Sequence, residues 1–229
     1  MTEQRFELLV FDWDGTLMDS QARIVACIRA GFADCGLEPP TREAAADIIG
    51  LGLNDAMARL LPGVSQGQIT AVAAAYRRHF LGDEPTPEGL FPGAAETLSR
   101  LDAEGYLLAV ATGKSRVGLN RSLDQTGLGH RFVATRCADE TFSKPHPQML
   151  VELMDELGVA PRHTLMIGDT EYDMQMAANA GAAALAVCHG VHDRERLLAC
   201  AALDCLEALP AIPPWLATHA PATKDRACR

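Results

Sequence analysis

The segment Phe11-Asp-Trp-Asp-Gly-Thr-Leu17 follows an apolar run, Phe6–Asp12, that has the length and composition of a buried strand. Two carboxylates, Asp12 and Asp14, stand where this strand ends and a turn containing glycine begins. Ligands of open parallel sheets bind outside the carboxyl ends of the strands, so acids at this position are candidates for chemistry. Taken alone, the same segment is equally compatible with an ordinary turn.

Four further apolar runs have the length of buried strands, and helical patterns separate the later ones. The runs are Tyr106–Thr112, Phe132–Arg136, His163–Asp169 and Ala183–Val187, and the helical patterns are Pro92–Glu104, Arg116–Thr126, Pro147–Leu157 and Glu171–Ala180. Alternation of this kind predicts a parallel sheet with helices on both faces. Near-continuous apolar strands fit a sheet that is covered on both sides. We therefore expect an α/β fold with a Rossmann-like core.

Residues 16–88 break the alternation, because they offer four helical segments and no convincing strand. Side chains that cap helices, and a glycine that ends one, stand at the expected boundaries. These residues are Ser20 and Gly36 for the first helix, Thr41 and Asn54 as caps of the next two, and a capping box of Ser65 and Gln68 ahead of Ile69–Phe80. The pattern predicts an all-α cap domain inserted after the first strand.

The domain boundaries follow from this insertion. The α/β core is expected to comprise residues 1–15 and 89–216, with the helical cap at residues 16–88. The segment Gly82–Gly93 is rich in turn residues and is the expected return linker. Residues 217–229 form a short polar tail that we expect to be frayed or disordered.

Four segments with chemical side chains stand at the ends of predicted strands or shortly after them. They are Phe11–Leu17, Ala111-Thr-Gly-Lys-Ser115, Ser143-Lys-Pro-His-Pro147 and Ile167-Gly-Asp-Thr-Glu-Tyr-Asp173. The carboxyl ends of parallel strands meet at one edge of a sheet, so segments far apart in sequence can form one crevice there. Each motif alone has an unremarkable structural explanation, whereas all four in order favour a shared site.

Four acids would crowd negative charge at this edge: Asp12, Asp14, Asp169 and Asp173. Such a group is unfavourable without a cation, and hard oxygen ligands with room for water suit Mg²⁺. A carboxylate can also act as the nucleophile in phosphoryl transfer. The transition state then needs charge neutralisation and alignment, which Mg²⁺ and a lysine could supply.

The four segments resemble, in order, the motifs of the haloacid dehalogenase superfamily, in the branch similar to phosphoglycolate phosphatases. The matching patterns are D-x-D-G-T-L-x-D-S, T-G after the second strand, K-P-x-P, and G-D-x-x-x-D. The resemblance covers nearly the whole chain, because a helical cap between the first two motifs is also a feature of the family. Trp13 departs from the smaller residue usual in this branch, and Gly113 from the frequent asparagine.

The resemblance implies a role for each matching residue. Asp12 would be the nucleophile, and Asp14 the general acid and then the base, with its carbonyl on the metal. Thr112, Gly113 and Lys144 would bind the transferring phosphate, and Lys144 would also steady Asp12. Asp169 and Asp173 would complete the Mg²⁺ site with Asp12 and Asp14.

The segment Ile48-Ile-Gly-Leu-Gly-Leu53 occupies the place of a substrate-specificity loop in the cap of relatives. Gly50 and Gly52 are therefore candidate specificity residues. As a bare pattern, the same segment is a helix end followed by a turn, and the sequence leaves both interpretations open.

The implied function is Mg²⁺-dependent hydrolysis of a small organic phosphomonoester, such as phosphoglycolate, through an aspartyl phosphate. The expected partner is a small phosphorylated metabolite. Pyrophosphatase and nucleotidase activities share every motif and remain open. So does a non-catalytic interaction or signalling protein of this fold, although such proteins usually lose one of the acids.

Other chemistries of the family fit less well. A dehalogenase would not need both Asp169 and Asp173. A phosphonatase would need a lysine in the cap, and residues 16–88 contain none. A sugar-phosphate mutase would need a histidine early in the cap, yet the first histidine of the chain is His79. A receiver domain would be about half as long and would lack the insertion.

Composition limits which other classes of protein the chain can belong to. The net charge of −10 argues against a nucleic-acid binder with a broad basic surface. No apolar run reaches the roughly 18 residues that span a bilayer, and the N-terminus lacks the pattern of a signal peptide, so we expect a cytoplasmic protein that does not bind membranes.

The seven cysteines are expected to be reduced thiols, and His189 and His192 are expected to be surface residues. The sequence is compatible with a monomer or a homodimer.

Overall fold

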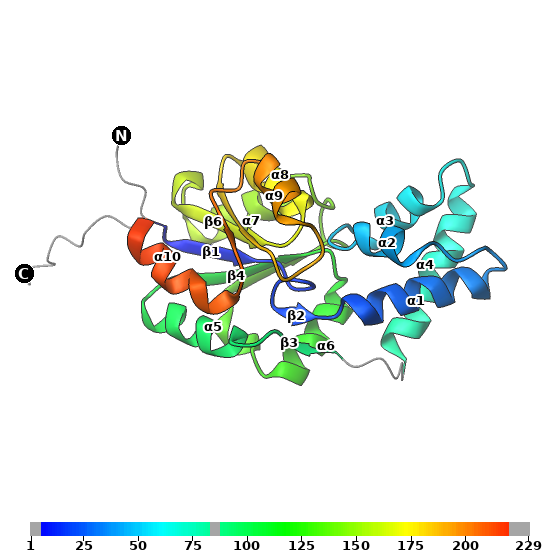
Figure 1. The fold of residues 1–229 in the computed structure, drawn as a ribbon, viewed down its shortest axis with the longest axis horizontal. Coiled ribbons are helices and arrows are strands. Elements are labelled where there is room, and N and C mark those ends of the chain that lie inside the picture. The colour runs from blue at the N-terminus through cyan, green and yellow to red at the C-terminus, as the bar shows by residue number, and fades with distance from the viewer. Residues whose placement is uncertain (1–5, 83–87, 220–229) are drawn as a thin grey trace, which may run out of the picture.

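The computed structural model describes residues 6–82 and 88–219 and has an α/β core next to a group of helices (Figure 1). The core sheet has six strands in the order β5-β4-β1-β6-β7-β8, and every neighbouring pair is parallel. The strands are β1 (Leu8–Phe11), β4 (Leu107–Thr112), β5 (Ala134–Cys137), β6 (Thr164–Gly168), β7 (Ala183–Val187) and β8 (Cys205–Leu206). The predicted fold class is confirmed.

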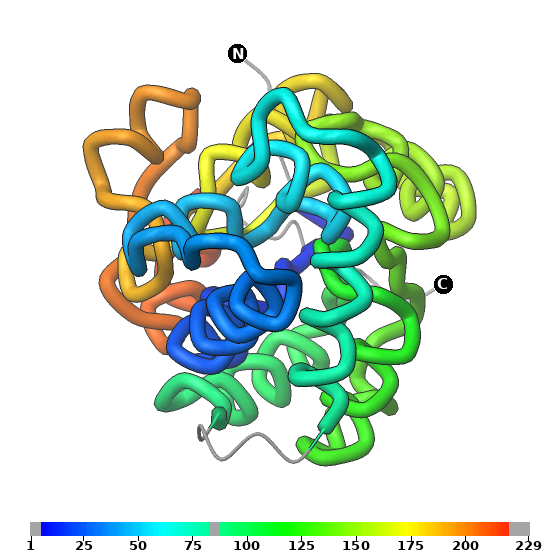
Figure 2. Tube along the Cα trace, turned by 90° about the vertical axis from the view of Figure 1, so that its right-hand side faces the viewer, coloured from blue at the N-terminus to red at the C-terminus, as the bar shows by residue number. Residues whose placement is uncertain are grey.

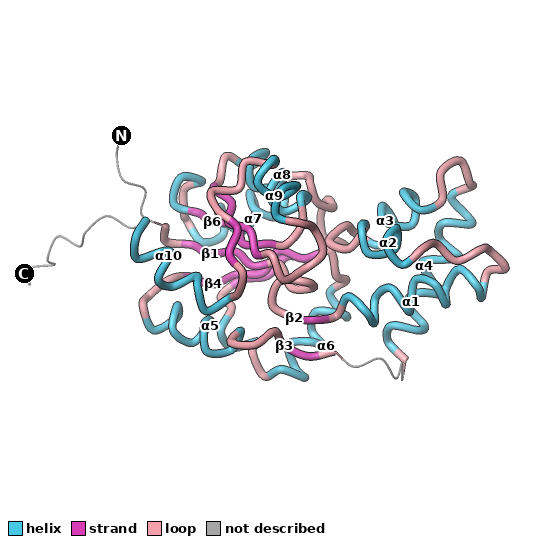
Figure 3. Tube along the Cα trace, viewed as in Figure 1, coloured by secondary structure: helices cyan, strands magenta, loops and turns pink. Residues whose placement is uncertain are grey.

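Helices cover both faces of this sheet. One face carries α5 (Ala94–Ala103), α6 (Arg116–Thr126) and α10 (Ile212–His219), and the other carries α7 (Gln148–Leu157), α8 (Glu171–Ala180) and α9 (Arg194–Ala199). Successive strand side chains point to opposite faces, so Leu9 and Phe11 enter the first layer while Leu8 and Val10 enter the second. Figure 3 shows the strands enclosed between these helices.

The cap consists of four helices with a hydrophobic core of their own. They are α1 (Gln21–Asp34), α2 (Arg42–Asp47), α3 (Leu53–Leu60) and α4 (Gln66–Leu81). Buried side chains such as Ile28, Phe32, Met57 and Val72 pack together between them. Figure 2 shows the cap in front of the core. The described residues also contain three short 3₁₀ helices: Gly129–Arg131, Pro161–His163 and Leu209–Ala211.

Two connections join the cap to the core, and they pair with each other. β2 (Met18–Asp19) and β3 (Gly89–Leu90) form a two-stranded antiparallel ribbon. The prediction of no strand within residues 16–88 was therefore wrong for Met18–Asp19. Two residues are too few for a hydrophobic period, so only pairing with the returning chain defines this strand. The central part of the expected linker, residues 83–87, lies outside the described residues.

Most predicted helix boundaries are confirmed. Thr41 caps α2 by accepting a hydrogen bond from the amide of Ala44, and Ser65 forms the expected capping box with Gln68. Asn54 is not a cap, because α3 begins at Leu53 with Gly52 before it. Ser20 stands at the N-cap position of α1, but its side chain donates to Asp14 instead of capping the helix.

Two expectations for the C-terminal half need correction. The tail was expected to begin at residue 217, whereas α10 continues to His219, and residues 220–229 lie outside the described part of the chain. Cys188 and Cys205 form a disulfide, although all the cysteines were expected to be reduced. The parallel pairing of β7 with β8 brings the two residues together, and their spacing in sequence gives no sign of it.

None of the helices in residues 6–82 and 88–219 has the length and hydropathy that a membrane span requires.

Candidate active site

Three buried carboxylates meet at the carboxyl end of the sheet. Asp12 follows β1, Asp169 follows β6, and Asp173 lies in the first turn of α8. All three are fully buried, and each contributes a carboxylate oxygen to a group within 4.8 Å. Lys144 is the cation of this group, since its Nζ lies 2.9 Å from Asp12 Oδ1 and 2.6 Å from Asp173 Oδ1. We call these four residues the Asp12 cluster.

Neighbouring segments hold the acids in place. β1 and β6 are adjacent, with Phe11 opposite Ile167, so Asp12 and Asp169 both lie within two residues of this pair. Asp169 accepts hydrogen bonds from the Thr16 hydroxyl at 2.7 Å and from the Val191 amide at 2.9 Å. Asp173 accepts from the amide and hydroxyl of Thr170 in a capping box, so its position follows from the start of α8.

The backbone approaches Asp169 so closely that only glycine fits on two sides. A Cβ at Gly15 or at Gly190 would lie 2.2 Å from Asp169 Oδ2. Gly15 also has a φ of +82°, a conformation that glycine adopts without steric cost. Gly15 therefore allows the turn after β1 and leaves room for the carboxylate of Asp169.

The Asp12 cluster contains more negative than positive charge. Burial raises the pKa of Asp12 well above its usual range, and Asp173 and Asp169 raise it further against the opposing effect of Lys144. Burial and the charge of Asp173 raise the pKa of Asp169 to about 7. Asp12 Oδ2 is buried and has no hydrogen-bond partner among the described residues. A hard divalent cation such as Mg²⁺ fits this donor set, because it would supply the missing positive charge and bind that oxygen.

The side chain of Asp14 lies apart from this cluster. Its Oδ1 accepts a hydrogen bond from Ser20 at 2.5 Å and lies 2.8 Å from Lys114 Nζ. Lys114 is itself buried, with its ammonium 4.5 Å from the centre of the Phe80 ring of the cap. The sequence motif includes Lys114, but nothing in the pattern indicated that it would bury its charge beside Asp14.

Trp13 is larger than the residue usual at its position in the first motif, and the structure shows where its side chain lies. Its amide donates to Asp12 Oδ1 at 2.7 Å, while its side chain is buried in the core and packs edge-to-face against Phe132. Only the backbone of Trp13 faces the site, so its large ring adds to the stability of the core.

The cap segment 48–53 rests on the core next to the site. A Cβ at Gly113 would lie 2.6 Å from the carbonyl oxygens of both Gly50 and Leu51, so the two backbones touch there. The Gly52 amide donates to Ser143 Oγ at 2.7 Å. Thr112 is buried and accepts a hydrogen bond from the Lys114 amide. Sequence reasoning placed Gly50, Gly52, Thr112 and Gly113 near a substrate, and the fold brings all four together.

A second group of charges joins the cap to the core. Arg196 forms ion pairs with Asp47 of α2 at 2.5 Å and with Glu171 of α8 at 2.7 Å. His192 lies beside them and accepts a hydrogen bond at Nδ1 from the Glu171 amide. Burial and the nearby Arg196 charge lower the pKa of His192. We call these four residues the Asp47 cluster.

His192 was expected to be a surface residue, and its 4% exposure shows that this was wrong. Its ring fills the contact between cap and core, which no local pattern reveals. His189 is half-buried and its Nε2 lies 2.9 Å from the carbonyl oxygen of Thr16. In the described part of the chain, neither histidine belongs to the group of side chains that could bind a metal.

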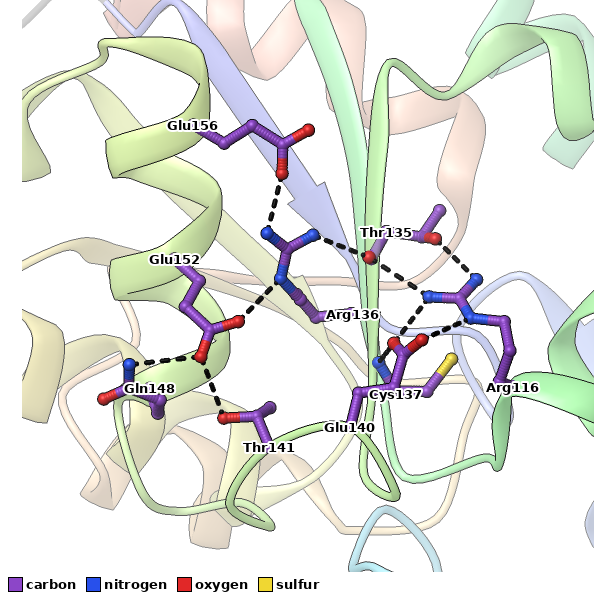
Figure 4. A network of polar contacts seen from close by, with 9 residues as sticks. All are labelled: Arg116, Thr135, Arg136, Cys137, Glu140, Thr141, Gln148, Glu152 and Glu156. Atoms are coloured by element: carbon purple, nitrogen blue, oxygen red, sulfur yellow. Dashed lines mark hydrogen bonds and ion pairs between the residues drawn. The ribbon is translucent and has the colours of Figure 1, made fainter.

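A network of ion pairs fixes the segment that leads to Lys144 (Figure 4). Arg116 of α6 binds Glu140 at 2.6 Å, and Glu140 accepts a hydrogen bond from the Cys137 amide. Arg136 of β5 binds Glu152 of α7, which also accepts from the hydroxyl of Thr141. The loop after β5 is therefore tied to helices on both faces of the sheet just before it delivers Lys144.

The chain matches the family of haloacid dehalogenase-like hydrolases over residues 9–187. It is 37% identical over 196 residues to "Probable phosphatase IndB" of Dickeya dadantii, covering 84% of this chain and 85% of the relative. It is 29% identical to a phosphoglycolate phosphatase of Agrobacterium fabrum, covering 81% and 82%. A solved structure from Haemophilus somnus, described as a predicted phosphoglycolate phosphatase, superposes with a TM-score of 0.83 at 24% identity over 94% of this chain and 99% of that chain.

The chain belongs to the haloacid dehalogenase-like hydrolases. At the level that the fold, the buried acids and these relatives share, it is a phosphatase of that family.

Proposed function

We propose that this protein is a Mg²⁺-dependent phosphatase that hydrolyses a small organic phosphomonoester through an aspartyl phosphate on Asp12. The observation that carries the proposal is the Asp12 cluster: three buried carboxylates, one lysine and a buried oxygen of Asp12 that has no hydrogen-bond partner among the described residues. A buried excess of negative charge is costly, so its presence at a sheet edge is explained best by a bound cation.

The positions of the site residues support the following roles. Asp12 would attack phosphorus, and Lys144 would neutralise a phosphoryl oxygen while orienting the Asp12 carboxylate. Asp12, Asp169 and Asp173, with the carbonyl of Asp14, would hold Mg²⁺, which offsets the charge of the phosphate when bound. Thr112 and the amide of Gly113 would donate hydrogen bonds to phosphoryl oxygens.

Asp14 is suited to proton transfer because its carboxylate stands outside the Asp12 cluster, near the cap. It would protonate the leaving alkoxide as Asp12 attacks. It would then take a proton from the water that hydrolyses the aspartyl phosphate. Ser20 and Lys114 hold Asp14 Oδ1, which leaves its second oxygen available for this exchange.

Several relatives are named phosphoglycolate phosphatases, so phosphoglycolate is the first substrate to test. The contact of segment 48–53 with Gly113 and Ser143 supports a cap that closes over a small substrate. Closure would exclude water until the aspartyl phosphate forms, and reopening would release the product alcohol.

The test is turnover by the purified protein of p-nitrophenyl phosphate, phosphoglycolate, pyrophosphate and nucleoside monophosphates. We expect EDTA to abolish activity and Mg²⁺ to restore it, with Ca²⁺ a poor substitute because it takes more ligands at longer distances. Full activity in chelator would refute the metal requirement. Absence of turnover on every compound would favour a non-catalytic protein of this fold.

A further inference from the structure

A cavity of about 330 Å³ lies between the cap and the core, and its lining includes Gly113 and Ser143, the chain neighbours of Thr112 and Lys144. On the core side it is lined by Asp14, Gly113, Lys114 and Ser143, which border the proposed position of the phosphoryl group. Segment 48–53 of the cap forms another part of its wall. A leaving group bonded to a phosphoryl group at Asp12 would therefore extend into this space.

Apolar side chains predominate on the cap side of the cavity, which Asn54, Asp55 and Arg77 also line. Ile24 and Ile28 of α1, Met57 of α3, and Tyr76 and Phe80 of α4 face it. Tyr76 stacks on Phe80, with ring centres 5.4 Å apart, so two aromatic side chains form one surface. Apolar walls of this kind favour an apolar ligand surface, because both are removed from water on binding.

The size of the cavity is large for a two-carbon leaving group. A volume of 330 Å³ lies within the roughly 300–1,000 Å³ of pockets that bury drug-sized ligands. Glycolate would fill a fraction of this space and would leave most of the isoleucine, methionine and aromatic wall without an apolar partner.

Lys114 marks the polar end of the cavity. Its ammonium lies between Asp14 Oδ1 and the Phe80 ring and has no hydrogen bond of good geometry among the described residues. An ammonium carries three donors, so Lys114 can donate to an oxygen of the leaving group close to the ester. The remainder of the leaving group would then lie against the apolar walls.

We propose that the preferred substrate is the phosphomonoester of an alcohol with an apolar body, larger than glycolate and of the size of an aromatic ring or more. This inference rests on the proposed phosphatase function and defines the substrate class of the same site. The ring or chain of the alcohol occupies the space between α1, α3, α4 and α6, and the ester end lies beside Lys114 and Asp14.

Benzyl phosphate and ethyl phosphate give a direct test, because both release a primary alcohol and differ mainly in apolar bulk. In Mg²⁺, we expect kcat/KM for benzyl phosphate to exceed that for ethyl phosphate and for phosphoglycolate by at least roughly tenfold. Benzylphosphonate should inhibit more strongly than methylphosphonate by a similar factor. Equal values of kcat/KM for benzyl and ethyl phosphate would overturn the inference.

A variant that fills the cavity tests whether the preference for benzyl phosphate arises there. Gly118 in the first turn of α6 lines the cavity, and among the described atoms outside its own helix backbone the nearest to a Cβ there would be Ser115 Oγ at 3.4 Å. Gly118→Leu is expected to lower the ratio of kcat/KM for benzyl over ethyl phosphate about tenfold. Gly67→Leu is the matched control, since Gly67 lies in the first turn of α4, is exposed and does not line the cavity. It should leave the ratio unchanged.

The outcomes separate the inference from the proposed function. Turnover without preference for the larger alcohol, or a ratio that Gly118→Leu does not alter in a folded protein, overturns the inference alone. If Gly118→Leu does not fold, the wild-type comparison of benzylphosphonate with methylphosphonate decides the same point. A protein that hydrolyses no phosphomonoester in Mg²⁺ overturns the proposed function, and the inference with it.

Discussion

The Asp12 cluster, within the core, and the Asp47 cluster, between cap and core, are both groups of charges, yet they differ in burial and in balance. The ion-paired side chains of Asp12, Lys144 and Asp173 are 0% exposed. Those of Asp47, Arg196 and Glu171 are 36%, 30% and 19% exposed. The first group has three carboxylates and only one lysine. The second has two carboxylates, which both pair with Arg196, and Arg59 adds a further positive charge 3.9 Å from Asp47.

The difference separates a site from a structural contact. Charges that keep contact with water are screened, so the Asp47 cluster can join cap and core without a large energetic cost or gain. Buried charges without balance are unfavourable unless a further cation or a proton arrives. The Asp12 cluster is therefore suited to binding a cation, and the Asp47 cluster to a contact between cap and core that costs little to break.

The largest effect is expected from the acids of the first motif. Asp12→Asn should abolish turnover and leave no covalent phospho-enzyme, because the nucleophile is lost. Asp14→Asn should reduce turnover by roughly 10²–10⁴-fold but still form some phospho-enzyme from activated phosphates. Acid quenching with mass spectrometry measures the intermediate. Equal accumulation in both variants would show that the two roles are assigned incorrectly.

Lys144→Met tests how strongly the buried charges depend on their cation. Removal of one partner from a buried ion pair typically costs about 3–5 kcal/mol, so the metal-free variant should be strongly destabilised in urea unfolding. Mg²⁺ should restore part of the loss. Arg131→Met is the control, because Arg131 forms an ion pair with Asp102 that is 27% and 50% exposed, and a small effect is expected. A change below about 1 kcal/mol for Lys144→Met would contradict the comparison.

The pH dependence of metal stabilisation distinguishes the clusters further. The raised pKa of Asp169, about 7, means that the metal-free folded protein holds a proton that the unfolded chain releases near pH 4. That contribution to the free energy of unfolding is complete below the unfolded pKa and is lost as pH rises through about 7. Mg²⁺ bound at the Asp12 cluster would compete with this proton.

The increase in Tm on adding a fixed concentration of Mg²⁺ should therefore be larger at pH 8 than at pH 6. Taking the difference with and without metal at each pH cancels groups that titrate elsewhere, such as His192. The Asp47→Asn variant should show the same dependence. An increase in Tm that is equal at the two pH values, or larger at pH 6, would count against a proton-competing metal site.

Asp47→Asn should have the smallest effect on stability. Exposed ion pairs contribute about 0.2–1 kcal/mol, which corresponds to a change in Tm of a few degrees at this chain length. KM should rise while kcat changes little, because the closed position of the cap is weakened. Asp102→Asn removes a comparable ion pair within the core and should leave KM unaltered. A loss of several kcal/mol on Asp47→Asn would show that the two clusters do not differ as described.

Local patterns predicted the core elements because each depends on a short stretch of chain. The α6 and α8 boundaries coincide with the predicted ranges, since Ser115 and Thr170 begin these helices and glycines end them. Asn54 failed as a cap because the helix start is set by the contact of Gly52 with Ser143, which is remote in sequence. The strand at Met18 was missed for the same reason.

The sequence by itself determined the α/β alternation, the helical insertion and the identity of the acids at the strand ends, because periodicity and turn residues act within one segment. Only the tertiary structure decided which side chains meet. It placed Lys144 between Asp12 and Asp173, buried Lys114 beside Asp14, paired Cys188 with Cys205 and set His192 and Arg196 against Asp47. These contacts join residues from separate elements, and their energy depends on burial, which no single segment specifies.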